Sequence, residues 1–323
     1  MRNTRAVIDL SRLERNYLCL LGAHGAGRIM IVLKANAYGH GMIPAAKFLA
    51  GLGQELFAVA VLDEAIKLRH AGIRGRILVL SPHEPGSAPE YPLHRLEMTV
   101  ASLHHLEAAA GEFKAGDASP EGLEIHLKLD TGMGRIGLQP GEVPAARALL
   151  AKTPAIHLRA VYSHFAESEK MASGFCDAQL AAFEAARAEL LQGHDGPPPE
   201  AHLANSAGLL RDPRYHFDYA RTGYALWAPL VFDVPADAPP GAPNEPPLNR
   251  ELEAVMTLKT RITHLKAMPA GATVGYGRTH TCEEGEVIAT LPIGYGDGYF
   301  RQMSNTGFVS IAGRRHPIVG SVS

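Results

Sequence analysis

Eight short apolar segments, most of them separated by helical segments, constrain the fold of this chain more than any other feature of its sequence. Their residues are apolar in continuous runs rather than in alternation, which is typical of strands that are covered on both faces and pair in parallel. Eight such units within about 230 residues predict a (β/α)8 barrel of the α/β class. The predicted strands are residues 28–34, 57–62, 77–81, 98–102, 124–130, 156–164, 201–206 and 218–226.

An open, doubly wound sheet is the competing arrangement for the same pattern. Such a sheet usually has fewer strands and carries a G-x-G-x-x-G fingerprint after the first of them. The segment after the first strand here reads "ANAYGHG" and lacks that spacing, so we favour the barrel. The preceding segment, "AVIDLSRLERNYLCLLG", predicts a short strand and a helix, with Ser11 and Glu14 at the spacing of a capping box.

The chain changes character after the eighth strand. Residues 233–250, "DVPADAPPGAPNEPPLNR", are too rich in proline for a helix or a central strand and predict a linker. Residues 251–323 read as strands joined by Gly and Pro turns, which predicts a smaller all-β domain. We assign residues 1–232 to the barrel domain with its N-terminal strand and helix. The final "VGSVS" falls inside a predicted strand, so we expect the C-terminal domain to be truncated.

Charge and cysteine content argue against several classes of function. The formal net charge is −2, without the basic footprint of a nucleic-acid-binding protein. The sequence holds no apolar run of about 18 residues that would predict a membrane span, and its first residues lack the apolar core of a signal peptide. Three scattered cysteines, Cys19, Cys176 and Cys282, predict free thiols in a cytoplasmic protein.

Side chains capable of chemistry stand at the C-terminal ends of the predicted strands, where barrel enzymes place their active sites. The buried run "IMIVLK" ends on Lys34, although lysine is seldom buried without a partner. A lysine nucleophile among arginines, hydroxyls and glycines suits a phosphorylated carbonyl compound, and pyridoxal phosphate is the commonest cofactor of this chemistry. The strand-end residues are Lys34, Tyr38, His40, Asp130, Arg135, Ser163, His164, Asn205, Ser206, Arg221 and Gly223.

A succession of motifs along nearly the whole chain makes this interpretation more specific. The motifs are, in order, "VLKANAYGHG", "LKLDTGMGRIG", "HLANSAG", "ARTGYALW", "MTLKTRI", "VGYGRT" and "LPIGYGDGYFR". Together they resemble the motifs of the alanine racemases, which are fold-type III pyridoxal-phosphate enzymes. The resemblance implies a homodimer, assembled head to tail, that interconverts L- and D-alanine and supplies D-alanine for peptidoglycan.

The resemblance also assigns residues to the cofactor. It implies that Lys34 holds pyridoxal phosphate covalently and that the Tyr38 hydroxyl reaches its phosphate. Glycine lets the backbone approach a phosphate closely, which is the physical reason for Gly223 in this cradle. The remaining residues that the resemblance places at the cofactor are Asn205, Ser206 and Tyr224, together with His164.

Arg221 resembles the residue that faces the pyridine nitrogen. A guanidinium keeps its proton, so the nitrogen would stay unprotonated and the ring would be a weaker electron sink. We expect this to restrict the enzyme to proton exchange at Cα. His202 is either a hydrogen-bonding support for Arg221 or an ordinary core histidine.

Racemisation needs one acid/base group on each face of the substrate. The resemblance implies Lys34 for one face and Tyr276 of the other subunit for the second. Because a free tyrosine has a pKa of about 10, such a base needs help, and His164 and Arg221 are the candidates for a polar chain to it.

The resemblance gives further roles outside this pair. Arg135 would meet the substrate carboxylate or the phenolic oxygen of the cofactor. Lys128 matches a lysine that some members carry carbamylated, although a plain strand lysine fits as well. Tyr295, Asp297 and Arg301 resemble residues at the entrance to the site, and Asp297 could instead only form the turn before Gly298. The histidines show no metal-ligand spacing, so we expect no metal.

Several alternatives stay open. A basic-amino-acid decarboxylase would share the architecture but should place an acidic residue where Arg221 stands. A non-catalytic cofactor-binding barrel should lack the β-domain and its "VGYG" tyrosine. A racemase of broader specificity, notably for serine, or a truncated chain without turnover are further possibilities. The family usually has an arginine where this chain has Ser321, which bears on substrate positioning.

Overall fold

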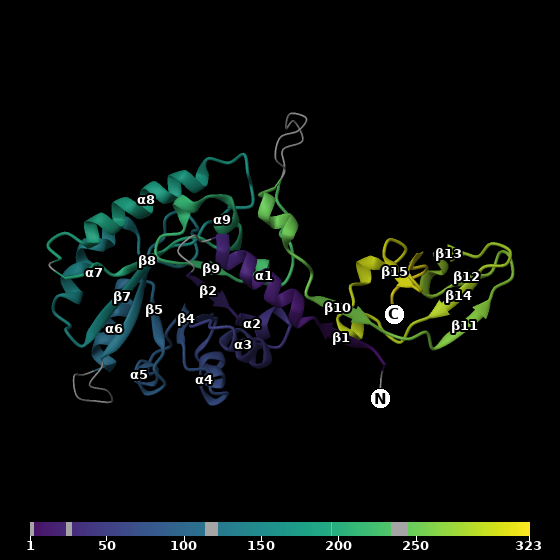
Figure 1. Ribbon diagram of the computed structural model, residues 1–323, viewed down its shortest axis with the longest axis horizontal. Helices are drawn as coiled ribbons and strands as arrows, with labels where there is room; N and C mark the ends of the chain where they lie inside the picture. Colours follow the sequence, from purple (N-terminus) through teal and green to yellow (C-terminus); the bar gives the residue numbers. More distant parts are fainter. Residues whose placement is uncertain (1–2, 24–27, 114–121, 195, 234–244) are drawn as a thin grey trace. The chain divides into compact units, whose positions relative to one another are not determined.

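The computed structural model describes residues 3–23, 28–113, 122–194, 196–233 and 245–323. The chain divides into two compact units, residues 9–255 and residues 1–8 with 256–323. The larger unit is the barrel, and its helices surround the sheet (Figure 1). Most of the expected linker, residues 234–244, lies outside the described residues, and Pro247–Glu251 that follow form a 3-10 turn.

The barrel is a parallel sheet of eight strands in the order β8-β7-β6-β5-β4-β3-β2-β9. Two backbone hydrogen bonds join its ends, from Asp218 N to Ala201 O and from Arg221 N to Ala204 O, both 3.0 Å long. The predicted barrel of the α/β class is therefore confirmed. The strands are β2 (Ile29–Val32), β3 (Leu56–Val59), β4 (Arg76–Pro82), β5 (Glu97–Val100), β6 (Leu123–Lys128), β7 (Ile156–Tyr162), β8 (Glu200–His202) and β9 (Ala220–Thr222).

Helices follow most strands, as the alternating pattern predicts. The helices are α1 (Leu10–Ala23), α3 (Met42–Gly51), α4 (Leu62–His70), α5 (Glu90–Leu93), α6 (Leu103–Glu112), α7 (Val143–Leu150), α8 (Phe175–Leu190) and α9 (Ser206–Arg211), and the segment labelled α2 (Lys34–Tyr38) is a left-handed turn. None of the described helices is both long enough and apolar enough to cross a lipid bilayer.

The interior of the barrel has an apolar side and a polar side. Met30, Val32, Leu56, Ala58, Leu78 and Tyr219 form a buried apolar cluster, mostly on β2, β3 and β4. Strands β5 to β9 instead bury polar side chains that hydrogen-bond across the interior, among them His126 and His202. The continuous apolar runs therefore predict the strands correctly but not the polar filling on this side.

The start of the chain differs from the sequence expectation in two respects. Strand β1 (Arg5–Ile8) pairs antiparallel with β10 (Met256–Lys259), so it belongs to the smaller unit rather than to the barrel. The carboxylate of Asp9, not Ser11, caps α1, because its Oδ1 accepts hydrogen bonds from the backbone N–H groups of Ser11 and Arg12 at 3.0 and 3.1 Å. The capping box proposed for Ser11 and Glu14 is wrong, since the helix already begins at Leu10.

The smaller unit consists of short antiparallel strand pairs and 3-10 turns, which confirms the predicted all-β domain. Besides β1 and β10, its strands are β11 (His264–Ala267), β12 (Thr273–Val274), β13 (His280–Thr281), β14 (Val287–Thr290), β15 (Phe308–Ile311) and β16 (Arg314–Pro317). The pairs are β11 with β14, β12 with β13, and β15 with β16. Its turns include Tyr276–Arg278, Tyr295–Asp297 and Arg301–Met303.

Candidate active site

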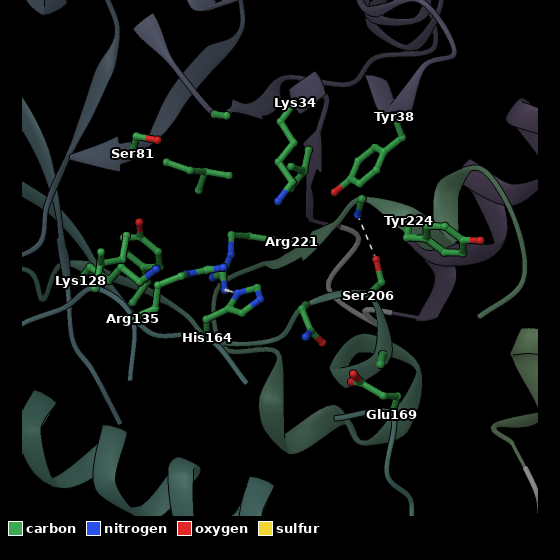
Figure 2. A pocket seen from close by; sticks show the side chains of 18 of the residues that line it. Lys34, Tyr38, Ser81, Lys128, Arg135, His164, Glu169, Ser206, Arg221 and Tyr224 are labelled. Carbon is green, nitrogen blue, oxygen red and sulfur yellow. Dashed lines mark hydrogen bonds between the residues drawn. The ribbon is translucent and has the colours of Figure 1, made fainter. Parts of the chain in front are cut away.

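A cavity of about 620 Å³ opens at the C-terminal ends of the barrel strands. Figure 2 shows the side chains that point into it from several strands and from the loops that follow them. Sequence reasoning predicted ten of its lining residues, and the fold brings these ten together: Lys34, Tyr38, Lys128, Arg135, His164, Asn205, Ser206, Arg221, Gly223 and Tyr224.

Lys34 enters the cavity from an unusual turn. The backbone of residues 35–38 is left-handed, with φ between 52° and 56° at four successive residues, none of them glycine. This conformation costs roughly 1–2 kcal/mol per residue for L-amino acids. Hydrogen bonds hold it in place, from Ala35 N to Glu64 Oε1 (2.8 Å) and from Gly41 N to Asn36 O (2.9 Å). The turn lets Lys34 and Tyr38 reach the same cavity, with the Lys34 ammonium 6.0 Å from the centre of the Tyr38 ring (Figure 2).

Ser206 and Gly223 form the part of the cavity wall next to Tyr38. The Ser206 Oγ accepts hydrogen bonds from the backbone N–H groups of Gly223 (3.0 Å) and Ala225 (3.3 Å). A Cβ at position 223 would overlap the Tyr38 hydroxyl and lie 2.9 Å from its Cζ, closer than real Cβ atoms come to a neighbour. Asn205 caps α9 through its Oδ1, which accepts from Gly208 N at 2.9 Å.

Arg221 lies on β9 with its guanidinium held from two sides. One terminal nitrogen donates to His202 Nδ1 (2.5 Å) and His202 O (3.1 Å). The other donates to Ser163 O (2.7 Å), Leu203 O (3.0 Å) and His164 Nδ1 (3.1 Å). Within the described part of the chain the Arg221 Nε–H has no hydrogen-bond acceptor. The predicted contact of His202 with Arg221 is present, and Arg221 also contacts His164.

Several basic side chains line the cavity, and burial disfavours the charged forms of two of them, Lys128 and Arg221. Burial, together with the nearby charges of Arg221 and Arg135, lowers the pKa of Lys128 to about 7. Burial also lowers the pKa of Arg221 to about 10, and it holds the pKa of His164 well below its ordinary value, assisted by Arg221. A cavity that combines the buried Arg221 and Lys128 with Lys34 and Arg135 favours an anionic ligand, because the buried cations have little water to stabilise their charge.

Arg135 reaches the cavity from the loop after β6. The Asp130 Oδ1 accepts hydrogen bonds from the backbone N–H groups of Gly132 and Gly134, both 3.0 Å long, and so shapes this loop. Asp130 itself therefore acts through the backbone, whereas Arg135 lies at the cavity wall.

Four further predicted site residues, Tyr276, Tyr295, Asp297 and Arg301, belong to the smaller unit. Tyr276 is 76% exposed and Tyr295 is 62% exposed, which is unusual for tyrosines and leaves their hydroxyls available to a further molecule. Asp297 closes the turn Tyr295–Asp297, because its Oδ2 accepts from Gly294 N at 3.1 Å. Arg301 begins the next turn. The proposed turn-forming role of Asp297 is thus present, and the entrance roles of these residues stay predictions.

One group of described residues has donor atoms close enough for a metal ion: His280, Cys282 and Glu286, within 4.8 Å of one another. Both oxygens of Glu286 already accept hydrogen bonds, from His280 Nε2 (2.8 Å) and from Glu283 N (3.0 Å). These hydrogen bonds are typical of a turn and account for the closeness of the three residues. The cluster therefore does not change the expectation that the protein works without a metal.

Sequence reasoning missed Tyr162 as a site residue. Its ring lies beneath the guanidinium of Arg221, whose Cζ is 5.1 Å from the ring centre, and beneath the Lys128 ammonium at 5.3 Å. A tyrosine within an apolar strand reads as core, so the only available signal was its position one residue before Ser163.

Comparison with known proteins identifies the chain. Residues 8–229 match the family described as alanine racemase, N-terminal domain, and residues 255–323 match alanine racemase, C-terminal domain. The chain belongs to the alanine racemase family. The alanine racemase of Symbiobacterium thermophilum is 38% identical over all of this chain and 82% of its own length. That of Carboxydothermus hydrogenoformans is 36% identical over all of this chain and 83% of its own length.

Solved alanine racemase structures share the fold. The enzyme of Streptomyces coelicolor superposes with a TM-score of 0.87 at 29% identity, over 99% of this chain and 82% of its own. The enzyme of Streptomyces lavendulae gives 0.85 at 31% identity, over 100% of this chain and 82% of its own. The resemblance to the alanine racemases drawn from the motifs is thereby confirmed, as is the isomerase class. Members of this family use pyridoxal phosphate and are generally dimeric.

Proposed function

We propose that this chain interconverts L- and D-alanine with pyridoxal phosphate bound in the barrel cavity. The observation that carries the proposal is the pairing of Lys34 with Arg221. Lys34 follows β2, Arg221 lies on the neighbouring strand β9, and both line the cavity. Lys34 offers an amine, and Arg221 has a single N–H, on Nε, that is available to a ligand.

The cavity fits the cofactor in shape and charge. Gly223 has no Cβ, so the Tyr38 hydroxyl lies directly against its backbone. A phosphate cradle requires this kind of open backbone. Ser206 and the backbone of Tyr224 complete this wall, and Asn205 lies beside it. Lys34 would hold the cofactor covalently, and the surrounding cations would stabilise its phosphate and phenolic oxygen.

Bound pyridoxal phosphate would supply a partial electron sink for the charge left when Cα loses its proton. Arg221 limits that sink. Its guanidinium stays charged even though burial lowers its pKa to about 10, so Nε would donate a hydrogen bond to the pyridine nitrogen without giving up its proton. An unprotonated ring nitrogen would make the bound group a weaker electron sink, which would favour return of the proton to Cα by the chain's own residues.

The chain's own residues would move that proton. Lys34, once released by the substrate amine, would serve one face of Cα, and Tyr276 of the partner subunit would serve the other. Tyr276 is well exposed in the smaller unit, which supports its availability to a second chain in a head-to-tail homodimer. His164 contacts Arg221 at 3.1 Å and would connect that tyrosine to the cavity's charges.

Substrate selection would rest on Arg135, whose guanidinium suits a carboxylate. Lys128 is buried beside it, and because burial lowers its pKa to about 7 its amine is largely neutral above that pH. A neutral amine can react with carbon dioxide, which supports carbamylation of Lys128. Tyr295, Asp297 and Arg301 would line the entrance. Alanine would be the substrate, and the cytoplasmic product would feed peptidoglycan.

Borohydride reduction tests the proposal directly. The purified chain is loaded with pyridoxal phosphate, reduced, digested and mapped by mass spectrometry. We expect the pyridoxyl group on Lys34, with Lys128 in the same cavity as the internal control amine. Formation of D-alanine from L-alanine, measured with D-amino-acid oxidase, should accompany loading. A label on Lys128 alone, or a labelled Lys34 with release of carbon dioxide instead of D-alanine, would refute the proposal.

A further inference from the structure

A continuous line of hydrogen bonds runs from the cavity into the polar side of the barrel. Arg221 donates to His202 Nδ1 at 2.5 Å, His202 Nε2 lies 2.9 Å from His126 Nδ1, and His126 Nε2 lies 2.8 Å from Glu97 Oε2. The four residues come from β9, β8, β6 and β5. All four side chains are buried, at 6% exposure or less. We call Arg221, His202, His126 and Glu97 the barrel relay.

The two ends of the barrel relay fix the proton positions between them. A guanidinium can only donate, so His202 Nδ1 must be an acceptor and the ring carries its proton on Nε2. His202 then donates to His126 Nδ1, which leaves the proton of His126 on Nε2, facing the carboxylate of Glu97. Both histidines are therefore neutral and share one tautomer. Burial and the charge of Arg221 also hold the pKa of His202 well below its ordinary value.

Packing allows the middle of the relay little freedom. The His202 ring is stacked between Tyr162 and Tyr219, with ring centres 4.6 and 4.7 Å away and interplanar angles of 11° and 23°. The ring cannot flip to exchange its two nitrogens without displacing a tyrosine. Its tautomer therefore decides whether Arg221 finds an acceptor or a second donor.

Glu97 is the only anionic group of the relay. Burial raises its pKa, but hydrogen bonds from His126 and Arg76 outweigh this and lower the pKa to about 2. Arg76 contacts Glu97 Oε1 at 2.5 Å and Glu200 Oε2 at 2.8 Å. Arg221 itself has no carboxylate in salt-bridge contact among the described residues. The relay connects it to an anionic group, Glu97, only through the two imidazoles.

We propose that Glu97, acting through His126 and His202, is a positioning residue for Arg221: its carboxylate sets the direction of every proton in the relay and so keeps the Nε–H of Arg221 turned to the cavity. The inference rests on the role proposed for Arg221 at the cofactor. It extends that role to two residues that touch neither cofactor nor substrate.

Replacing Glu97 by glutamine should reverse the relay. The amide has one acceptor oxygen, and the cationic Arg76 forms a stronger hydrogen bond to it than the neutral His126 does. The amide NH2 then faces His126 Nε2, so the proton of His126 moves to Nδ1 and faces His202. His202 must in turn place its proton on Nδ1, directly against the N–H of Arg221.

Glu200→Gln is the matched control. Glu200 also pairs with Arg76, and it contacts Arg28 at 2.9 Å, but the structure shows no hydrogen bond or ion pair between Glu200 and either histidine of the relay. A merely structural role in the Arg76 cluster would make the two variants alike. The positioning role predicts that only Glu97→Gln changes the histidines and the enzyme.

The first measurement is nitrogen NMR of histidine side chains in the cofactor-free protein, so it does not depend on the proposed function. We expect neutral Nε2–H tautomers for His126 and His202 in the wild type and in Glu200→Gln. In Glu97→Gln both signals should move to the Nδ1–H tautomer or broaden. Unchanged signals in Glu97→Gln, or doubly protonated rings in the wild type, would overturn the proposal.

The second measurement is on the loaded enzyme. Glu97→Gln should lower kcat for alanine by roughly tenfold or more, with KM little changed, and raise half-transamination relative to racemisation. Glu200→Gln should leave both within about twofold. Equal losses in the two variants would overturn the proposal, whereas absence of cofactor binding in the wild type would instead refute the proposed function.

A second pair of variants keeps the test decisive if Glu97→Gln does not fold. His126→Leu removes the acceptor for His202, whereas His126→Gln can keep one on its amide oxygen. We expect His126→Gln to recover most of the kcat that His126→Leu loses. Equal activity in these two variants would show that the relay does not position Arg221.

Discussion

The bare backbone of Gly223 gives the sharpest test of how the cavity is built. In Gly223→Ala the new methyl group would overlap the Tyr38 hydroxyl and lie 2.9 Å from Cζ and 3.2 Å from Cε2 of that ring. Tyr38 must therefore move out of the cradle. Overpacking of this kind costs typically about 1–3 kcal/mol, and because about 1.4 kcal/mol equals a factor of ten, cofactor affinity should fall roughly 5- to 150-fold.

The assay is a fluorescence titration of the cofactor-free protein with pyridoxal phosphate, beside urea unfolding of each variant. Gly111→Ala is the control, because a Cβ there meets no atom within 4 Å. Gly111 lies inside α6, so this change should leave affinity unchanged and stabilise the fold by roughly 0.5–1 kcal/mol.

A double-mutant cycle with Tyr38→Leu identifies the cause. Since the clash is with the tyrosine ring, Gly223→Ala should cost much less once the ring is gone, with a coupling energy of about 1–3 kcal/mol. Additive effects within about 0.5 kcal/mol would refute the idea that close approach to Tyr38 is why position 223 is glycine.

Three further outcomes follow from the site. Ser206→Ala leaves the buried N–H groups of Gly223 and Ala225 without their acceptor, so urea unfolding should show a loss of about 2 kcal/mol; a loss below about 0.5 kcal/mol would contradict this. Lys128 has a folded pKa of about 7, below its ordinary value of 10.5. Its charge therefore opposes folding fully below pH 7, and the effect fades as the pH rises from 7 to 10.5. Lys128→Met in carbon-dioxide-free buffer should thus raise the free energy of unfolding by a few kcal/mol at pH 6 and about half as much at pH 9, and a gain independent of pH would be inconsistent with it. Arg221→Glu should raise half-transamination relative to racemisation, followed by the cofactor's absorbance, and an unchanged ratio would show that Arg221 does not limit the electron sink.

The barrel and the cavity residues near its strand ends were predictable because both depend on local patterns. Continuous apolar runs specify buried parallel strands, and the C-terminal ends of such strands meet on one face. Lys34, Arg135, Ser206 and Arg221 follow from that rule without any knowledge of the tertiary structure.

Other features depend on contacts distant in sequence and could not be predicted in this way. Nothing local shows that residues 35–38 adopt a left-handed turn, since hydrogen bonds from outside hold it. Strand β1 joins the smaller unit because its partner β10 lies some 250 residues later. Glu97 and His126 lie on different strands, and only the closed barrel shows that they form one line with Arg221.

The unequal filling of the barrel matters for anyone who wishes to re-engineer this enzyme. On β2, β3 and β4 the interior consists of aliphatic and small side chains, and such cores accept exchanges that conserve volume. On β5 to β9 buried polar side chains hydrogen-bond to one another in series, so one substitution disturbs several neighbours at once. Libraries that vary the interior residues of β2, β3 and β4 should yield many folded, active clones. The interior residues of β5 to β9 tolerate variation only when whole sets of them change together.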